Sequence, residues 1–172
     1  MEPARLSVAQ WELDAADEEL RSFLANLRAG IHRKALHSLY FAAFHAVRSL
    51  LASRGIEAAT QSGVRLAFAL SFVKPGTVSR AGAKILSELQ SVRERADYQV
   101  EHAYDATDVV RHFATARPLF DELVRVLGAV AGLRSAGFAA AWRSVAEECA
   151  APKRKRQPSP RSGSRKTPTR AR

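Results

Sequence analysis

The stretch "HRKALHSLYFAAFHAVRSLLASR", residues 32–54, decides the fold of this chain. Its apolar side chains recur at helical spacing, at Leu36, Tyr40, Phe44, Val47 and Leu51. Further apolar residues widen this seam almost all the way round the helix. A helix that is apolar on most faces lies at the centre of a bundle, packed against several neighbours.

The flanking segments predict more helices and almost no strand. The alternation of β-branched residues that is typical of strands is nearly absent. We therefore expect an all-α fold, an up-and-down bundle of four to five helices. Its parts are an N-terminal helix within residues 1–29, a helical domain over 30–127, a further helix within 128–150, and a tail over 151–172.

Capping residues and proline predict where the helices begin, end or bend. Amphipathic spacing predicts helices over about 8–27, 63–72 and 79–95, and one that ends near residue 127. Ser62 and Thr107 are the expected N-caps of the second and the last of these. Leu70 is expected to point inward, and Pro118 to kink or split the helix that contains it, because proline lacks the backbone donor.

Positive charge is concentrated in the tail. The chain carries 27 Lys and Arg residues against 17 Asp and Glu, but nine of these bases and no acid fall after Ala151. The tail is also rich in Pro and Ser, which predicts disorder. Such a segment attracts phosphate backbones through counterion release, and without aromatic residues its binding is expected to be nonspecific. A purely solubilising role is the alternative.

Several classes of protein are excluded or disfavoured. The single cysteine, Cys149, rules out an internal disulfide and a cysteine zinc site. His37 and His45 stand two turns apart, about 12 Å along a helix, which is too far for a shared metal ion. We expect no metal and no cofactor. Neither a signal peptide nor an 18-residue apolar span is present, so a cytoplasmic location without membrane contact is expected.

Three blocks carry a family resemblance: "SLYFAAFHAVRSLLASRGIEA" (38–58), "TQSGVRLAFALSFVKPGTVS" (60–79) and "LSELQSVRERADY" (86–98). Together they resemble the HEPN domain family, specifically the group with an Arg-x-x-Ala-Asp-Tyr motif, here Arg93–Tyr98. The resemblance covers about residues 30–127. It implies an all-α bundle that forms a homodimer and works with a nucleotidyltransferase-fold partner, in toxin–antitoxin or related systems.

The same resemblance implies where an active site would lie. Catalytic members of the family are metal-independent ribonucleases with an Arg-x(4–6)-His motif. No histidine follows Arg93 at that spacing, whereas Arg95 and His102 fit it formally. The chain also has Thr60-Gln61 where the group commonly has Thr-His.

The candidate site residues come from "SVRERADYQVEH", residues 91–102. For catalysis they are Arg93, Arg95 and His102, because metal-free RNA cleavage needs a base near neutral pKa and a cation for the charge on phosphorus. The alternative is a helix-end ion pair of Arg93 with Asp97, beside an exposed His102.

For binding of a nucleotide, RNA or a partner, the candidates are Arg93, Asp97, Tyr98 and His45. Tyr98 is expected to bury its ring and present its hydroxyl to polar neighbours. The family resemblance further implies that a partner's nucleotidyl transfer could modify this tyrosine. His45 is expected to approach Arg93 from the neighbouring helix.

Three functions are open at this point. The first is a HEPN-like module that contacts RNA or a nucleotide and partners a nucleotidyltransferase-fold protein. The second is a metal-independent endoribonuclease toxin that uses Arg93 or Arg95 and His102. The third is a non-catalytic adaptor whose basic tail binds nucleic acid.

Overall fold

The computed structural model describes residues 2–99, 101 and 103–151. Within them the fold is all-α, as the sequence predicts, and no strand occurs. The elements are α1 (Pro3–Ala29), α2 (His32–Ser53), α3 (Gln61–Phe68) with a π-helical turn η1 (Ala69–Val73), α4 (Arg80–Tyr98), α5 (Ala106–Gly128) and α6 (Ala136–Ala150).

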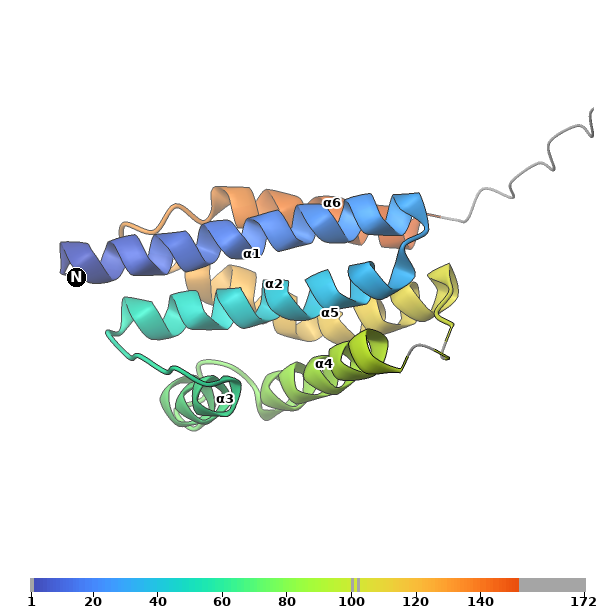
Figure 1. The fold of residues 1–172 in the computed structure, drawn as a ribbon. Coiled ribbons are helices and arrows are strands. Elements are labelled where there is room, and N and C mark those ends of the chain that lie inside the picture. The colour runs from blue at the N-terminus through green and yellow to red at the C-terminus, as the bar shows by residue number, and fades with distance from the viewer. Residues whose placement is uncertain (1, 100, 102, 152–172) are drawn as a thin grey trace, which may run out of the picture.

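α2 is the central helix of the bundle (Figure 1). α1 runs antiparallel beside it, α4 and α5 pack against its other sides, and α6 covers α1 and α5. Its position follows from its composition, since small and large apolar residues cover most of its faces and permit close approach from several directions. The prediction that residues 32–54 form the centre of the fold is confirmed.

An aromatic cluster joins α5 and α6. The Trp142 indole stacks on Phe120 with ring centroids 4.4 Å apart, and the Phe113 ring lies 5.2 Å from the indole. The Trp142 Nε1–H donates to Asp121 at 2.8 Å, so the buried ring keeps a partner for its polar edge. The segment over 128–150 therefore adds a helix that completes the core.

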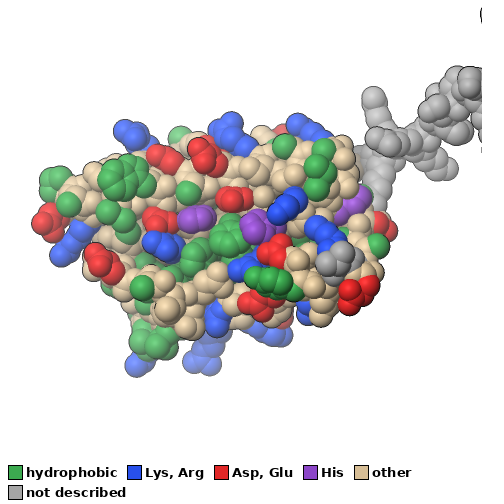
Figure 2. Space-filling view, in the orientation of Figure 1, with side chains coloured by type: hydrophobic (Ala, Val, Ile, Leu, Met, Phe, Trp, Pro, Cys, Tyr) green, Lys and Arg blue, Asp and Glu red, His purple; other side chains and the backbone are tan. Residues whose placement is uncertain are grey.

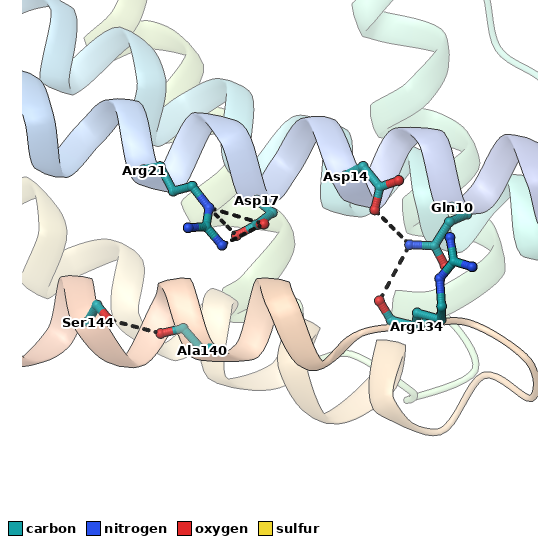
Figure 3. A network of polar contacts seen from close by, with 7 residues as sticks. All are labelled: Gln10, Asp14, Asp17, Arg21, Arg134, Ala140 and Ser144. Carbon is teal, nitrogen blue, oxygen red and sulfur yellow. Dashed lines mark hydrogen bonds and ion pairs between the residues drawn. The ribbon is translucent and has the colours of Figure 1, made fainter.

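The loop before α6 is tied to α1 by one side chain (Figure 3). The Gln10 side-chain oxygen accepts a hydrogen bond from the Arg134 backbone N–H at 2.9 Å, and its NH₂ group donates to the Arg134 carbonyl and to Asp14. Gln10 is buried, and these bonds satisfy its amide. Near the C-terminal ends of α1 and α6, an ion pair joins Arg28 to Glu148.

The short third helix differs from the prediction in two ways. Its N-cap is Thr60, whose hydroxyl accepts from the Gly63 N–H, and not Ser62. The expectation that Leu70 points inward is wrong, because this side chain is 55% exposed. Phe68 and Phe72 take the buried face, and a residue two positions from Phe68 lies about 200° round the helix.

The helix at residues 106–128 also differs in detail. Asp105, and not Thr107, is its N-cap, in a capping box with Asp108 that satisfies backbone donors of both residues. The helix is not split at Pro118. The side chains that follow the proline, Leu119 and Phe120, are fully buried, and their packing offsets the lost backbone hydrogen bond.

Two other helices, α1 and α4, are longer than expected. α1 begins at Pro3, where proline suits the first turn, and α4 continues through Asp97 to Tyr98. No helix of the described residues is long and apolar enough to cross a membrane.

Candidate functional site

α2 reaches solvent along one narrow stripe. From Ala35 to Leu51 every residue is buried except His37, Phe41, His45 and Arg48, which recur at helical spacing on one face. We call these four residues the α2 stripe. The rings of His37 and Phe41 lie 4.6 Å apart, and those of Phe41 and His45 lie 6.1 Å apart. On this side of the molecule, histidine side chains flank an apolar patch (Figure 2).

Asp97 of α4 holds the first histidine of the stripe. Its two carboxylate oxygens lie 3.1 and 3.2 Å from His37 Nδ1, and one of them lies 3.5 Å from Arg93 Nη1. A carboxylate only accepts, so Nδ1 carries the proton and Nε2 is the acceptor of the neutral ring. Asp97 thereby orients an imidazole in the way that a general base or a hydroxyl-binding group requires.

Glu12 of α1 holds the second histidine in the same manner. Its carboxylate lies 2.8 Å from His45 Nδ1 and 2.8 Å from Arg48 Nη2. Burial raises the pKa of Glu12, but the hydrogen bonds and charges of His45 and Arg48 outweigh this, and the net pKa lies below its usual value. Beside this cluster a cleft of about 280 Å³ opens, lined also by Val8 and Leu51.

The two histidines thus repeat one arrangement about 12 Å apart along α2. In each, a carboxylate from a flanking helix binds the histidine Nδ1 and an arginine. Phe41 lies between the two imidazoles. The stripe therefore offers two oriented imidazole acceptors on either side of an aromatic face.

Arg93 lies under the stripe. It is 9% exposed, and its guanidinium carbon lies 5.4 Å from the Tyr40 ring centroid and 5.3 Å from that of Phe41. Cation–π contact with two rings and the ion pair with Asp97 hold the charge in place. Arg93, a candidate for catalysis and for binding, is therefore buried and does not lie on the surface. Of the alternative to catalysis, the ion pair of Arg93 with Asp97 is confirmed, and the part that concerns His102 is not tested.

Tyr40, whose ring contacts Arg93, is also buried. The Tyr40 hydroxyl is buried and has no hydrogen-bond partner among the described residues, and neither has Arg93 Nε. Burial raises the pKa of Tyr40, and the charge of Arg93 only partly opposes this.

The other predicted site residues lie apart from this cluster. Tyr98 is 76% exposed, so the expectation of a buried ring is wrong; the residue ends α4, where no neighbouring helix covers it. His45 pairs with Glu12, and it is His37 that meets the Asp97–Arg93 pair. His102 lies outside the described residues. Arg95 is exposed and lines a cleft between α4 and α5 together with His112.

Basic groups gather where α2 begins. His32 Nδ1 donates to the Tyr104 carbonyl at 3.0 Å, and Arg33 donates to the carbonyls of Ala96 and Gln99 at the end of α4. Cations at a helix C-terminus are favourable because they complement its dipole. No cluster of metal-ligating side chains occurs among the residues that the structure describes.

Sequence reasoning missed His37 and Glu12 as site residues. Glu12 lies outside the blocks of the resemblance, and the packing of α1 on α2 brings it to His45. A signal for His37 was present, however, because His37, His45 and Arg48 are the histidine and arginine residues between Ala35 and Leu51, and they recur at helical spacing.

Comparison with known proteins agrees with this fold. A family described as the HEPN domain matches residues 9–127, which is more than half of the chain. The chain therefore belongs to the HEPN domain family, as its resemblance predicts. The match extends through α1, beyond the residues on which the resemblance was based.

Individual relatives are short archaeal and bacterial proteins. The chain is 37% identical to a UPF0332 protein of Pyrococcus horikoshii over 44% of its own length and 53% of the relative's. It is 26% identical to a protein of Methanocaldococcus jannaschii that bears the name "Putative toxin", over 52% of the chain and 66% of the relative. A UPF0332 protein of Thermotoga maritima is 27% identical over 54% and 70%. The chain thus spans about half to two thirds of the first two relatives.

Proposed function

We propose that this chain is an RNA-binding HEPN module of a toxin–antitoxin or related system, and that it contacts RNA along the α2 stripe. The observation that carries the proposal is the stripe itself. A central helix buried on every other side exposes two oriented imidazoles, an aromatic ring and an arginine. These are the groups that bind a single RNA strand, since bases stack on aromatic rings and the 2′-hydroxyl donates to an acceptor.

The spacing of the stripe suits this ligand. Phe41 lies between the two histidine rings, and because a carboxylate binds each Nδ1, each Nε2 is left to accept from a ribose hydroxyl. Arg48 at the end of the stripe, 39% exposed and paired with Glu12, is the cation that can reach a phosphate, whereas Arg93 is buried beside Asp97 and only supports the Phe41 ring. Because DNA lacks the 2′-hydroxyl, the stripe is expected to prefer RNA over DNA of the same sequence.

Fluorescence anisotropy with labelled single-stranded RNA and DNA tests this function. Phe41→Leu is expected to weaken RNA binding about tenfold, because base stacking contributes about 1–3 kcal/mol. His37→Gln is expected to reduce the preference for RNA. Trp11→Leu, which removes an exposed aromatic side chain on α1, is the matched control. Equal affinity of Phe41→Leu and wild-type protein would contradict the proposal.

The basic tail needs its own control, since it is expected to bind RNA nonspecifically. A variant that ends at Ala151 should show a smaller dependence of affinity on salt, while it keeps the effect of Phe41→Leu. If the effect of Phe41→Leu disappears with the tail, the stripe is not the RNA site. An adaptor that works through its tail alone would then be the better description.

The toxin relationship and the partner belong to the same proposal. The name of the M. jannaschii relative supports the proposal that the chain belongs to a toxin–antitoxin or related system. The family resemblance supports a homodimer and a nucleotidyltransferase-fold partner. Co-expression with such a protein encoded beside the gene, followed by size-exclusion chromatography with light scattering, tests both. A single co-eluting complex is expected, and two separate peaks would argue against the partnership.

A metal-independent endoribonuclease is the second candidate, and the His37–Asp97 pair favours it. An imidazole oriented by a carboxylate is suited to take the proton from a 2′-hydroxyl. Arg93, Arg95 and His102 remain candidates for the other roles. Incubation with labelled RNA in chelator tests this: cleavage that is lost in His37→Gln but kept in His45→Gln supports the enzyme. Absence of cleavage by wild-type protein removes it.

A further inference from the structure

The outer face of α1 is apolar in part, and no helix of the described residues covers it. Trp11 is 68% exposed and Val8 is 43% exposed, and both point away from the buried side of α1. Beside Trp11, a cleft of about 260 Å³ separates α1 from the loop before α6, and Leu6 and Gly132 also line it. An exposed indole at the edge of a cleft is a surface on which a further segment can pack.

Acidic side chains continue this face toward the C-terminal end of α1. Asp14 and Glu18 follow Trp11 by three and seven residues, so they lie on the same side of the helix. Glu19 lies next to Glu18. Among the described residues none of these three acids forms an ion pair, and Asp14 accepts one hydrogen bond from a neighbouring amide (Figure 3). Arg134 also lines the cleft, so three carboxylates face one guanidinium.

A basic segment is the chemical complement of this face. Carboxylates pair with Lys and Arg, and a guanidinium stacks well on an exposed indole. The chain itself carries such a segment, since residues 152–172 hold nine Lys and Arg and no acid. Residues 1–151 hold the other 18 bases and all 17 acids. Charge therefore favours the segment 152–172 as the occupant of the face.

This segment starts within reach of the face. The ion pair of Arg28 with Glu148 places the end of α6 beside the C-terminal end of α1 (Figure 1). Glu18 lies about 15 Å from Arg28 along the helix axis, and Trp11 lies about 26 Å from it. An extended chain covers about 3.3 Å per residue, so about five residues beyond Ala151 reach Glu18 and about eight reach Trp11.

We propose that residues 152–172 bind the outer face of α1 in the same chain, with a guanidinium on Trp11 and other bases at Asp14, Glu18 and Glu19. In the bound state these bases are withheld from phosphate backbones, so the contact is autoinhibitory toward nonspecific binding of nucleic acid. The contact does not depend on the RNA site proposed for the α2 stripe. It does mean that Trp11→Leu is a neutral control for the stripe only in the variant that ends at Ala151.

The NMR signals of α1 test the contact directly. The full-length protein is compared at low salt with the variant that ends at Ala151, and the Trp11 indole signal is assigned from Trp11→Leu. Signals between Trp11 and Glu19 are expected to differ between the two proteins, and high salt should remove the difference. Identical α1 signals in the two proteins would overturn the proposal. A difference that depends on protein concentration would also overturn it, because the segment would then come from a second copy.

A binding measurement tests the autoinhibition. Duplex DNA is the probe, because it reports phosphate contacts and lacks the 2′-hydroxyl. Glu18→Gln combined with Glu19→Gln is expected to raise the affinity of the full-length protein for DNA about fourfold, since two surface ion pairs no longer hold the segment. Glu94→Gln combined with Glu101→Gln changes two exposed acids elsewhere by the same charge and is the matched control. Equal gains for the two double variants, or the same gain in proteins that end at Ala151, would overturn the proposal.

Discussion

Replacement of Asp97 by alanine tests whether the cluster beneath the α2 stripe is held by this carboxylate. The substitution removes the partner of His37 Nδ1 and of the Arg93 guanidinium at once. Arg93 has a side chain only 11% exposed, so water cannot replace the lost contact fully. A buried cation without its counter-ion should therefore destabilise the fold.

The size of the effect follows from three contributions. Removal of one partner of a buried ion pair costs about 3–5 kcal/mol. The 3.5 Å separation and the 22% exposure of the Asp97 side chain reduce this value. Asp97 also lies in the last turn of α4, where a negative charge opposes the helix dipole, so its removal returns about 0.5 kcal/mol. We expect a net loss of about 2 kcal/mol, or roughly 4–8 °C in Tm.

Urea unfolding followed by circular dichroism measures the loss, and Asp17→Ala is a close control. Asp17 also pairs with an arginine four residues away and is 21% exposed, but its partner Arg21 is 66% exposed. An exposed pair of this kind contributes less than about 1 kcal/mol. Equal losses for the two variants would refute the reasoning, because they would mean that the aromatic rings alone hold Arg93.

Three further predictions concern other parts of the molecule. The pKa of Glu12 is lowered in the folded protein, so its contribution to stability is present above about pH 4.5 and is lost as the pH falls through the folded-state pKa. Glu12→Gln should therefore flatten this part of an acid-unfolding profile. An unchanged profile would contradict the role assigned to Glu12. Burial, with a smaller effect of Glu148, raises the pKa of Cys149 to about 11. At pH 8 a disulfide reagent should therefore react about 100-fold more slowly with the folded than with the unfolded protein, because only the thiolate reacts. Equal rates would contradict this prediction. Trp142→Ala should cost about 3–5 kcal/mol in urea unfolding and Trp11→Ala less than about 1 kcal/mol, since only the first ring is buried in the core; similar losses would contradict the packing described.

The centre of the fold was predictable because it depends on local pattern. Residues 32–54 are apolar in nearly every direction, and only a surrounded helix satisfies such a sequence. The ends of helices were less predictable, because several residues compete for each cap. Ser62 and Thr107 are reasonable caps, yet the neighbouring Thr60 and Asp105 make the hydrogen bonds.

The candidate site was predictable only where its residues share one helix. Arg93 and Asp97 are four residues apart on α4, so their ion pair follows from helix geometry. The partners of the two histidines come from other helices, and the axial register of α1 and α4 against α2 decides them. Periodicity within one helix carries no information about that register, which is why His45 was paired with the wrong neighbour.

The burial of Arg93 and the exposure of Tyr98 have the same origin. Both belong to one sequence motif, but five residues along a helix place them on different faces. The aromatic side chains of α2, Tyr40 and Phe41, cover the arginine, and no helix covers the tyrosine. Residues that belong to one sequence motif therefore need not lie on one surface of the protein.

Photo-crosslinking with RNA that contains 4-thiouridine tests most directly whether the α2 stripe holds RNA. Trypsin releases residues 35–48 as one peptide, "ALHSLYFAAFHAVR", which contains the whole stripe. We predict that the principal RNA adduct of the full-length protein lies on this peptide and is lost in Phe41→Leu. Adducts confined to peptides of the basic tail, or to helices other than α2, would contradict an RNA site at the stripe.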